Sequence, residues 1–443
     1  MARIFGQTLP LDMLVLWAVE TVICFFALYA ALNYGHVFPV IATLHVSEDA
    51  ALRAANITLL LGAVCFVLGL YRPTAILQIR MLFLTVAVAT MFALPIFWSV
   101  LGRQSIQPIL FGSRNVWLLE VMAYWVILLA GTRLLYGAAM RRGLFARTVM
   151  VVGYGQAATD IASALRVIQP CAFRITVATP GEMAVSSIRP WQIILAGVTP
   201  AEAASLGKQA RTTEIHTFCE TQFGRIDLAS LADPQLATHL QAAIGDSVAS
   251  RVLRRGLDIV GASVLLVLTA PVMLLTVLAV KLDSPGPAIY RQLRVGLGGR
   301  EFVILKFRSM RVDAERNGVA VWASVRDSRV TRVGAFIRKV RLDELPQLLN
   351  ILCGDMSLVG PRPERPSLVV DLNAAIPFFS MRTRVKPGLT GWAQINSAYT
   401  ASTVEAREKL SYDLYYAKNR TLMLDLMIIV ATVRILIFQV GSR

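Results

Sequence analysis

The sequence predicts a membrane protein of three parts: a four-helix transmembrane α-helical bundle, an α/β Rossmann-like middle domain, and an α/β monotopic C-terminal domain with a re-entrant helix. Three observations support this fold class. Hydrophobic residues make up 56% of the 443 residues and charged residues 16%, against about 45–50% and about 25% in soluble proteins. Four long apolar stretches occupy the first third of the chain. The net charge of +16 is concentrated at the other end, where residues 251–443 hold 28 Lys and Arg against 15 Asp and Glu.

This composition also limits the partners. A basic excess suits nucleic acid, an anionic membrane surface or phosphorylated substrates. Because the chain also carries membrane stretches, we expect the lipid bilayer and phosphorylated molecules, and no nucleic acid. Its five cysteines are scattered without a CxxC spacing, so neither a disulfide framework nor a zinc site is predicted.

Residues 1–140 are expected to form the transmembrane bundle. Each apolar stretch has close to the ~20 residues that cross a bilayer as a helix. The four stretches are Leu11–Leu32, Leu52–Leu70, Met81–Leu101 and Val116–Tyr136. Basic residues predict that both ends of the bundle face the cytoplasm; they are Arg3, Arg72, Arg80, Arg133, Arg141, Arg142 and Arg147. Two further basic residues, Arg103 and Arg114, lie in the loop between the last two stretches and favour the opposite orientation.

Residues 145–235 are expected to form the middle domain. The expected strands are Arg147–Val152, Phe173–Thr179 and Gln192–Val198, with a helix over Gln156–Arg166. The loop from Gly153 to Ala158 has the first two glycines of a dinucleotide fingerprint. However, no acid follows the second strand before Glu182, where such a site places a ribose-binding carboxylate. A structural or regulatory domain is therefore preferred over an NAD site, although the NAD reading stays open.

A fifth apolar run, residues 257–280, opens the C-terminal part. Basic residues flank it on both sides, and Pro271 near its middle favours a break in the helix. We expect a re-entrant helix that bends at Ala270-Pro271 and returns to the face it entered from. A straight fifth span is the alternative.

Residues 251–443 contain no histidine, so a Ser-His-Asp triad or a histidine metal cluster is excluded there. The strongest motif is the adjacent pair Asp343 and Glu344. Nearby Arg338, Lys339 and Arg341 should lower the pKa values of both acids and keep them ionised, able to bind Mg²⁺ or attack phosphorus. The alternative is an exposed acidic pair in surface salt bridges.

Further cations surround this pair in the sequence. Lys306 and Arg308 have strand spacing and should face the same way. Proline-stiffened Arg362 and Arg365 suit bidentate contacts to phosphate oxygens. A glycine-rich loop near Arg382 adds more polar groups. The candidate phosphate-binding residues are Lys306, Arg308, Arg338, Arg341, Arg362, Arg365, Arg384, Lys386 and Gln394.

These residues also carry a family resemblance. The motifs are KLDSPGP (281–287), KFRSM (306–310), RLDELPQL (341–348), DMSLVGPRPERP (355–366), VKPGLTGWAQIN (385–396) and YDLYYAKN (412–419). In this order they strongly resemble bacterial polyprenyl-phosphate hexose-1-phosphate transferases over 251–443. The preceding domains look like the large, exopolysaccharide-initiating members, and GRIDLASLAD (224–233) resembles the exosortase/PEP-CTERM-associated branch. Small members have Ser-Pro where this chain has Ala270-Pro271, so a hydroxyl-to-backbone bond is expected to be missing.

The resemblance implies a phosphoglycosyltransferase. It implies that Asp343 is the nucleophile and Glu344 a Mg²⁺ ligand, that a UDP-sugar and undecaprenyl phosphate are substrates, and that UMP is released through an aspartyl phospho-sugar intermediate. A homodimer is an analogy to large members. The sugar is not identified. The competing readings are a membrane-anchored NAD-dependent nucleotide-sugar dehydratase or epimerase, and a non-enzymatic scaffold.

A last apolar run covers residues 422–440. It carries Asp425 and Arg434. Charges at both positions favour a helix lying on the membrane interface over a sixth span.

Overall fold

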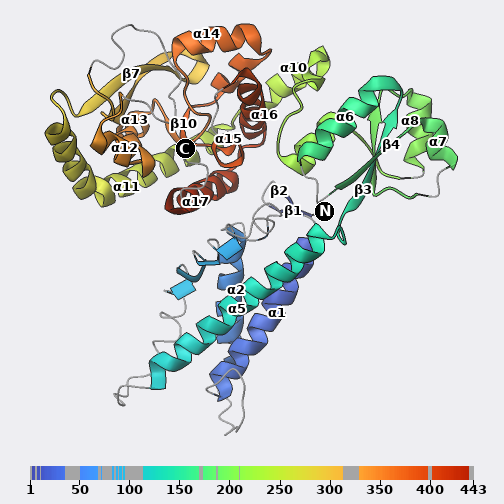
Figure 1. Cartoon of the computed structure of the whole chain (residues 1–443), viewed down its shortest axis with the longest axis horizontal. Helices are drawn as coiled ribbons and strands as arrows, with labels where there is room; N and C mark the ends of the chain where they lie inside the picture. Colours follow the sequence, from blue (N-terminus) through green and yellow to red (C-terminus); the bar gives the residue numbers. More distant parts are fainter. Residues whose placement is uncertain are drawn as a thin grey trace. The chain divides into compact units, whose positions relative to one another are not determined.

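The computed structural model forms two compact units, Met1–Phe218 and Cys219–Arg443 (Figure 1). It describes residues 2–4, 7–9, 11–34, 50–67, 71, 82–83, 86–87, 89–91, 93–94, 113–168, 173–185, 188–208, 210–312, 329–397 and 402–438. We describe the two units in turn.

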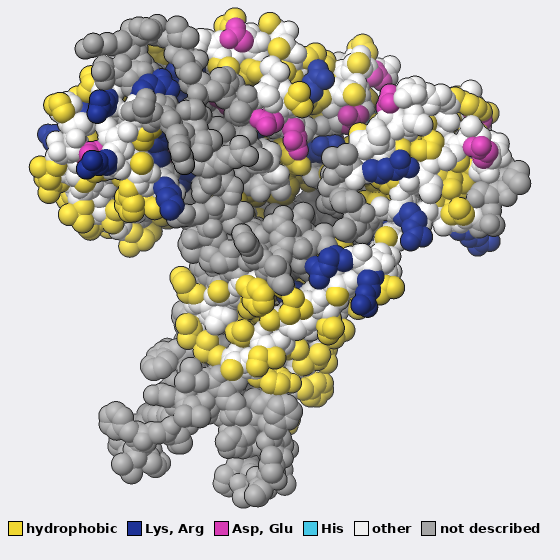
Figure 2. Space-filling model, viewed as in Figure 1, with side chains coloured by type: hydrophobic (Ala, Val, Ile, Leu, Met, Phe, Trp, Pro, Cys, Tyr) yellow, Lys and Arg dark blue, Asp and Glu magenta, His cyan; other side chains and the backbone are white. Residues whose placement is uncertain are grey.

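The first unit begins with a bundle of long apolar helices. They are α1 (Leu11–Tyr34), α2 (Ala50–Val67) and α5 (Ser113–Arg141), after a short hairpin of β1 (Ala2–Ile4) and β2 (Gln7–Leu9). Three of the expected spans are therefore helical, and Met81–Leu101 lies mostly outside the described residues. Apolar side chains cover the described part of this bundle in Figure 2. By length and composition, Met13–Ala30 and Met122–Arg141 are apolar enough to cross a membrane.

A polar cluster lies inside this bundle. Arg133 is completely buried and forms an ion pair with Glu20, which also accepts a hydrogen bond of 2.7 Å from the hydroxyl of Tyr71. The guanidinium of Arg133 also stacks over the Tyr71 ring. Arg133 was counted above among the basic residues that orient the bundle. Its charge is neutralised between helices, two turns before α5 ends, so Arg133 gives little support to the expected orientation, which stays a prediction.

A four-stranded parallel sheet follows in the same unit. Its strands are β3 (Arg147–Gly153), β4 (Phe173–Ala178), β5 (Gln192–Ala196) and β6 (Thr212–Glu214), in the order β4-β3-β5-β6. Its helices are α6 (Gly155–Ile168), α7 (Pro180–Val185), α8 (Pro200–Gly207) and α9 (Ile215–Phe218). The three expected strands and the first helix are confirmed, and β6 is additional. A Cβ on Gly153 would lie 2.1 Å from the carbonyl oxygen of Ala196, so close strand packing alone explains this glycine.

The second unit begins earlier than the expected residue 251. It starts with η2 (Cys219–Phe223), η3 (Ser230–Ala232) and α10 (Pro234–Ala243). Ile226, Leu231 and Leu240 are buried in the same core as Trp392 and Leu414. We call residues 219–247 the clasp. The middle domain was expected to reach residue 235, but its apolar side chains beyond Phe218 are buried against the second unit.

The rest of the second unit is an α/β arrangement of short elements. The hairpin β7 (Ile289–Val295) and β8 (Glu301–Phe307) turns through η4 (Leu297–Gly299), and β9 (Ser357–Val359) pairs in parallel with β10 (Gly388–Thr390). The helices are α11 (Val248–Asp283), α12 (Arg332–Lys339), η5 (Leu342–Glu344), α13 (Gln347–Cys353), α14 (Pro366–Ala375), η6 (Phe379–Arg384), α15 (Trp392–Asn396), α16 (Thr403–Asn419) and α17 (Leu422–Phe438).

Helix α11 is the longest element, with 36 residues, and it continues through Pro271. A straight helix of this size would be about 54 Å long. Both ends nevertheless contact this unit, since Asp258 accepts from the N–H of Leu358 and Asp283 from the N–H of Val333. Figure 1 accordingly shows α11 bent. The middle of α11 is apolar and exposed, as at Val267 (73%).

The re-entrant path of α11 through a membrane stays a prediction. Ala270 has no hydroxyl and so makes no hydroxyl-to-backbone bond, but the hydroxyl of the neighbouring Thr269 donates to the Leu265 carbonyl at 2.7 Å. Such bonds favour helix bending.

Helix α17 packs onto the second unit. Leu424 and Ile428 are buried in the main core. Asp425 is only 2% exposed and accepts hydrogen bonds from Arg254 (2.9 Å) and from the hydroxyl of Tyr416 (2.7 Å). Its charge is therefore satisfied inside the protein, and it does not argue for an interfacial position as the sequence suggested. The side chain of Arg434 lies outside the description.

Candidate active site

The two acids of the RLDELPQL motif lie in a tight turn between two helices. Thr331 caps the start of α12, and the helix ends at Lys339. Arg341 then adopts a left-handed conformation with φ 60°, which reverses the chain into the 3₁₀ turn η5 that carries Asp343 and Glu344. A non-glycine residue in this region is uncommon and strained. The strain at Arg341 therefore occurs directly beside the acid pair.

Glu344 is the centre of a cluster of cations. Its Oε1 lies 2.5 Å from Arg362, 3.4 Å from Lys306 and 3.8 Å from Arg341. Burial of the carboxylate opposes ionisation, but Arg362 and Lys306 outweigh it and hold the pKa of Glu344 well below its usual range. Glu344 is thus an anion throughout the physiological range, and the alternative of an exposed surface pair is excluded.

Asp343 is in a different environment from its neighbour. Its Oδ1 is buried and has no hydrogen-bond partner in the described part of the chain. Burial and the charge of Glu344 raise the pKa of Asp343 to about 6, against the opposing effect of Lys306 and Arg362. The expectation of a lowered pKa is confirmed for Glu344 and wrong for Asp343, because Glu344 takes the close contacts with the cations.

Lys306 and Arg308 do not share a face. Lys306 is in β8 and reaches Glu344. Arg308 follows the last residue of that strand, so strand alternation does not extend to it. It is buried and donates to the carbonyls of Ser284 (2.6 Å) and Pro285 (2.9 Å). Arg308 therefore holds the chain after α11 in place, and its position gives no support to the predicted phosphate contact.

Four other predicted contacts lie outside the cluster. Arg384 donates to the carbonyl of Gln241 in the clasp (2.8 Å), and Lys386 lies beside Gly354 after α13. Arg338 is in the last turn of α12, and Arg365 immediately precedes α14. Among the described residues these four do not line the cavity around the acid pair.

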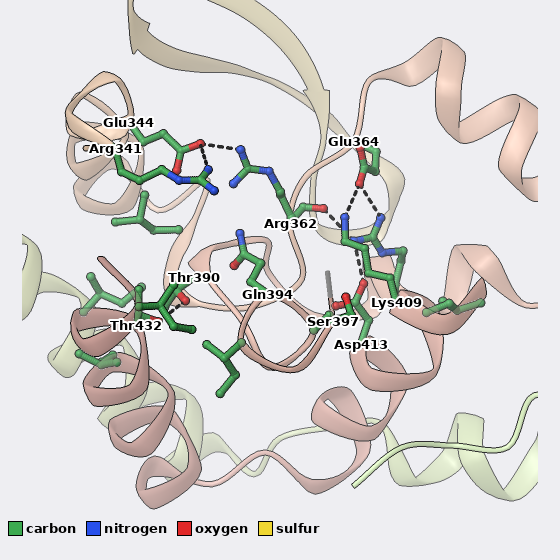
Figure 3. Close-up of a pocket in the computed structure, with 18 of the residues that line it drawn as sticks. Arg341, Glu344, Arg362, Glu364, Thr390, Gln394, Ser397, Lys409, Asp413 and Thr432 are labelled. Atoms are coloured by element: carbon green, nitrogen blue, oxygen red, sulfur yellow. Dashed lines mark hydrogen bonds and ion pairs between the residues drawn. The ribbon is translucent and has the colours of Figure 1, made fainter. Parts of the chain in front are cut away.

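The structure adds a second charged cluster that the sequence reasoning missed. Glu364 lies 2.8 Å from Lys409 and 3.7 Å from Arg382, and Arg382 also pairs with Asp413 at 2.8 Å. Arg382 donates to the carbonyl of Arg362 (2.8 Å) and so links the two clusters (Figure 3). Glu364 and Asp413 stand inside the DMSLVGPRPERP and YDLYYAKN motifs, which was the available signal.

Residues of both clusters line one cavity of about 500 Å³. Arg341, Glu344, Arg362 and Gln394 lie along one part of it, as Figure 3 shows. The predicted role of Gln394 at the site is supported by its position, and its buried Oε1 has no hydrogen-bond partner among the described residues. The remaining walls are largely apolar. The cavity thus combines hydrogen-bond acceptors and cations with an apolar surface.

The donor set around the acid pair suits one mode of Mg²⁺ binding. Mg²⁺ is commonly held by one or two carboxylates together with substrate phosphates. Asp343 and Glu344 supply two adjacent carboxylates. The Oδ1 atom of Asp343 has no hydrogen-bond partner among the described residues and could coordinate a metal ion. The described residues contain no group of three or more His, Cys, Asp or Glu that forms a complete protein cage. A metal here would depend on phosphate ligands.

The fold and the site together define a class: an α/β unit on a long apolar helix, with an acid pair and cations at one end of a partly apolar cavity. The model of the family described as bacterial sugar transferase matches residues 249–439. The chain is 44% identical over 229 residues to UDP-N-acetylgalactosamine-undecaprenyl-phosphate N-acetylgalactosaminephosphotransferase of Aeromonas hydrophila, covering 52% of this chain and 53% of that protein.

Two further relatives match a similar region. A UDP-glucose:undecaprenyl-phosphate glucose-1-phosphate transferase of Caulobacter vibrioides is 47% identical over 188 residues, 42% of this chain and 70% of that protein. The exopolysaccharide production protein PSS of Rhizobium leguminosarum is 39% identical over 188 residues, 41% of this chain and 94% of that protein. The chain belongs to the bacterial sugar transferase family. It spans about half the length of the Aeromonas relative.

Proposed function

We propose that this protein transfers a sugar-1-phosphate from a UDP-sugar to undecaprenyl phosphate, giving undecaprenyl-diphosphate-sugar and UMP, as a first step of exopolysaccharide synthesis. The observation that carries the proposal is the acid pair Asp343 and Glu344, in which Glu344 forms ion pairs with Arg362, Lys306 and Arg341. Glu344, Arg341 and Arg362 line the cavity. Such a cluster neutralises a diphosphate while an acid approaches phosphorus. The names of the relatives specify the same kind of transfer.

The chemistry divides between the two acids. In the proposed first step a carboxylate oxygen of Asp343 bonds to the sugar-bearing β-phosphorus, and the bond from that phosphorus to the bridging oxygen breaks, so UMP leaves with the electron pair. In the second step a phosphate oxygen of undecaprenyl phosphate attacks the same phosphorus and Asp343 leaves as a carboxylate. Asp343 must be ionised to begin, and Lys306 and Arg362 stabilise that form.

Glu344 serves a different purpose in this proposal. Its depressed pKa keeps it anionic, which suits a ligand of Mg²⁺ and an anchor for Arg362. Bound Mg²⁺ would supply further neutralisation of the diphosphate. Arg341 and Arg362 would orient phosphate oxygens, and Gln394 would accept a hydrogen bond from the substrate.

The same function implies a location at a membrane. We propose an inner-membrane enzyme whose second unit works on the cytoplasmic face, where UDP-sugars are found, with α11 re-entering the bilayer. The NAD-dependent alternative gains no support from the relatives, whose names specify phosphosugar transfer. In addition, Gly153 has a packing role against Ala196 that requires no cofactor.

The test is a screen of UDP-sugars with undecaprenyl phosphate and Mg²⁺ that follows UMP release by the full-length protein. A UDP-sugar labelled with ³²P in the β-phosphate, given without lipid, should label the wild-type protein, and undecaprenyl phosphate should remove the label. Asp343→Asn should abolish labelling and UMP release at every Mg²⁺ concentration. Glu344→Gln should weaken metal binding and lower activity, with partial recovery at high Mg²⁺ or Mn²⁺.

These measurements distinguish the overall transfer of sugar phosphate from the covalent step on Asp343. If UMP release requires undecaprenyl phosphate and no label ever appears after rapid quenching, the transfer stands but the covalent step is wrong. If no UDP-sugar gives UMP or lipid product, the transfer itself is wrong.

A further inference from the structure

The cavity of the active site has two chemically different parts. One part carries the charged side chains Arg341, Glu344 and Arg362. Another part, which we call the apolar arm, lies between the two apolar helices α11 and α17. Its wall consists of Leu265, Leu389, Ile429, Val433 and Ile435, together with Thr269, Thr390 and Thr432.

The polar atoms on the wall of the apolar arm are already satisfied by the protein. The hydroxyls of Thr390 and Thr432 bond to each other, as Figure 3 shows, and Thr432 also donates to the carbonyl of Ile428 (2.7 Å). Thr269 donates to Leu265. By contrast, the buried Oε1 of Gln394, beside the charged part, has no partner among the described residues. The arm therefore offers a ligand apolar surface, whereas the charged part offers donors and acceptors.

A nucleotide sugar does not account for such a wall. Its sugar, ribose and diphosphate are covered with hydroxyls and charged oxygens, and burying these groups against Leu, Ile and Val without hydrogen bonds is unfavourable. A ligand that matches both parts has an anionic head and an apolar tail. Of the two substrates proposed above, only a polyprenyl phosphate has this character.

The arm also opens in a suitable direction for such a tail. Leu265 is 40% exposed and Val433 38% exposed, so the wall reaches the surface of the unit at these two positions. Beside Leu265, α11 continues as exposed apolar surface at Val264, Leu268 and Val272. A chain can therefore pass from the apolar arm onto the apolar face of α11 without crossing a polar surface.

We propose that the apolar arm binds the isoprene units nearest the phosphate of the polyprenyl acceptor, with that phosphate lying at Arg341 and Arg362. The proposal rests on the function proposed above. It makes α17 part of the acceptor site, a role beyond packing against the core. It also explains why α11 and α17 flank one cavity: the tail of the acceptor enters between them, and its phosphate reaches the polar part after UMP has left.

The test fills the arm with larger side chains in the full-length protein. Leu265→Trp and Val433→Trp should each raise the KM for undecaprenyl phosphate about tenfold, equivalent to about 1.4 kcal/mol of lost binding. The KM for the UDP-sugar that supports turnover should change less than about twofold, within the noise of a surface substitution. Val267→Trp is the matched control, because Val267 is on the same helix, is 73% exposed and does not line the cavity. Its kinetic constants should equal those of the wild type.

Smaller variants protect the test against misfolding. If a tryptophan variant fails to fold, Leu265→Ala and Val433→Ala should still raise the KM for undecaprenyl phosphate, since they remove apolar wall. An unchanged KM for undecaprenyl phosphate in all folded variants overturns the proposal, as does an equal rise for both substrates. Failure of the wild-type protein to transfer sugar phosphate at all would instead reject the proposed function.

Discussion

Trp392 donates its indole N–H to the carbonyl oxygen of Gly224 across 2.8 Å. This bond joins α15 to the clasp, which precedes the region matched by the family model. Two residues after Trp392, Gln394 lines the active-site cavity. The clasp therefore holds in place the helix α15, which carries the cavity residue Gln394, although no residue of the clasp lines the cavity itself.

Gly224→Ala should destabilise the second unit. Gly224 has φ 60°, and a Cβ there would lie 3.0 Å from the Trp392 ring, so both the backbone and the neighbour oppose the substitution. We expect a loss of about 1–3 kcal/mol in the free energy of unfolding, measured by thermal or denaturant unfolding in detergent. Gly245→Ala is the matched control in the clasp, because a Cβ at Gly245 meets nothing within 4 Å. Equal stability of both variants would contradict this role for Gly224.

The ion pairs of Glu364 predict a pH dependence of stability. Burial would raise its pKa, but Lys409 and Arg382 outweigh burial and lower it from 4.5 to about 2. A depressed pKa in the folded state contributes stability above pH 4.5, and this contribution disappears as the pH falls from 4.5 to 2. Glu364→Gln should thus lose up to about 3 kcal/mol at pH 7, and the difference from wild type should shrink toward pH 2.

Glu408→Gln provides the comparison for this measurement. Glu408 is an exposed carboxylate on α16, one residue from Lys409. Its variant should follow the wild-type stability curve over the same pH range. A gap between Glu364→Gln and wild type that stays constant with pH would mean that lost packing, and not lost charge, is responsible.

Gly153→Ala should disrupt the middle domain and leave the chemistry intact. The added Cβ would meet the Ala196 carbonyl oxygen at 2.1 Å, an overlap that forces β3 and β5 apart at a cost of about 1–3 kcal/mol. Yield and melting temperature should fall, while turnover per folded molecule remains close to wild type. Gly181→Ala, where a Cβ has open space, should affect neither. A loss of turnover by orders of magnitude in folded Gly153→Ala would show that the domain takes part in the reaction.

The path of α11 can be tested by labelling. In a background without native cysteines, Arg251→Cys and Lys281→Cys should both resist a membrane-impermeant maleimide in intact cells and react after lysis. The reason is that basic residues flank both ends of the helix and Pro271 allows it to bend back. Labelling of Lys281→Cys from outside the cell would indicate a straight span.

The sequence alone determined the features that depend on local pattern. The apolar runs long enough to cross a membrane form the helices α1, α2, α5 and α11. The short runs rich in β-branched residues form strands of the parallel sheet. The acid pair and the cations Lys306, Arg341 and Arg362 were also predicted, because they stand in motifs whose residue types suit phosphate chemistry. These predictions rest on periodicity and residue chemistry, which need no knowledge of distant contacts.

The tertiary structure decided what depends on contacts between distant segments. Arg308 and Arg384 stand in the same kinds of motif as Lys306 and Arg362, but they donate to backbone carbonyls away from the cavity. Asp343 and Glu344 are neighbours, yet in the part of the chain that the structure describes Glu344 alone forms ion pairs with the cations, so their pKa values move in opposite directions. Charge and spacing in the sequence do not specify which side chain reaches a partner; packing of the intervening elements fixes the direction of each one.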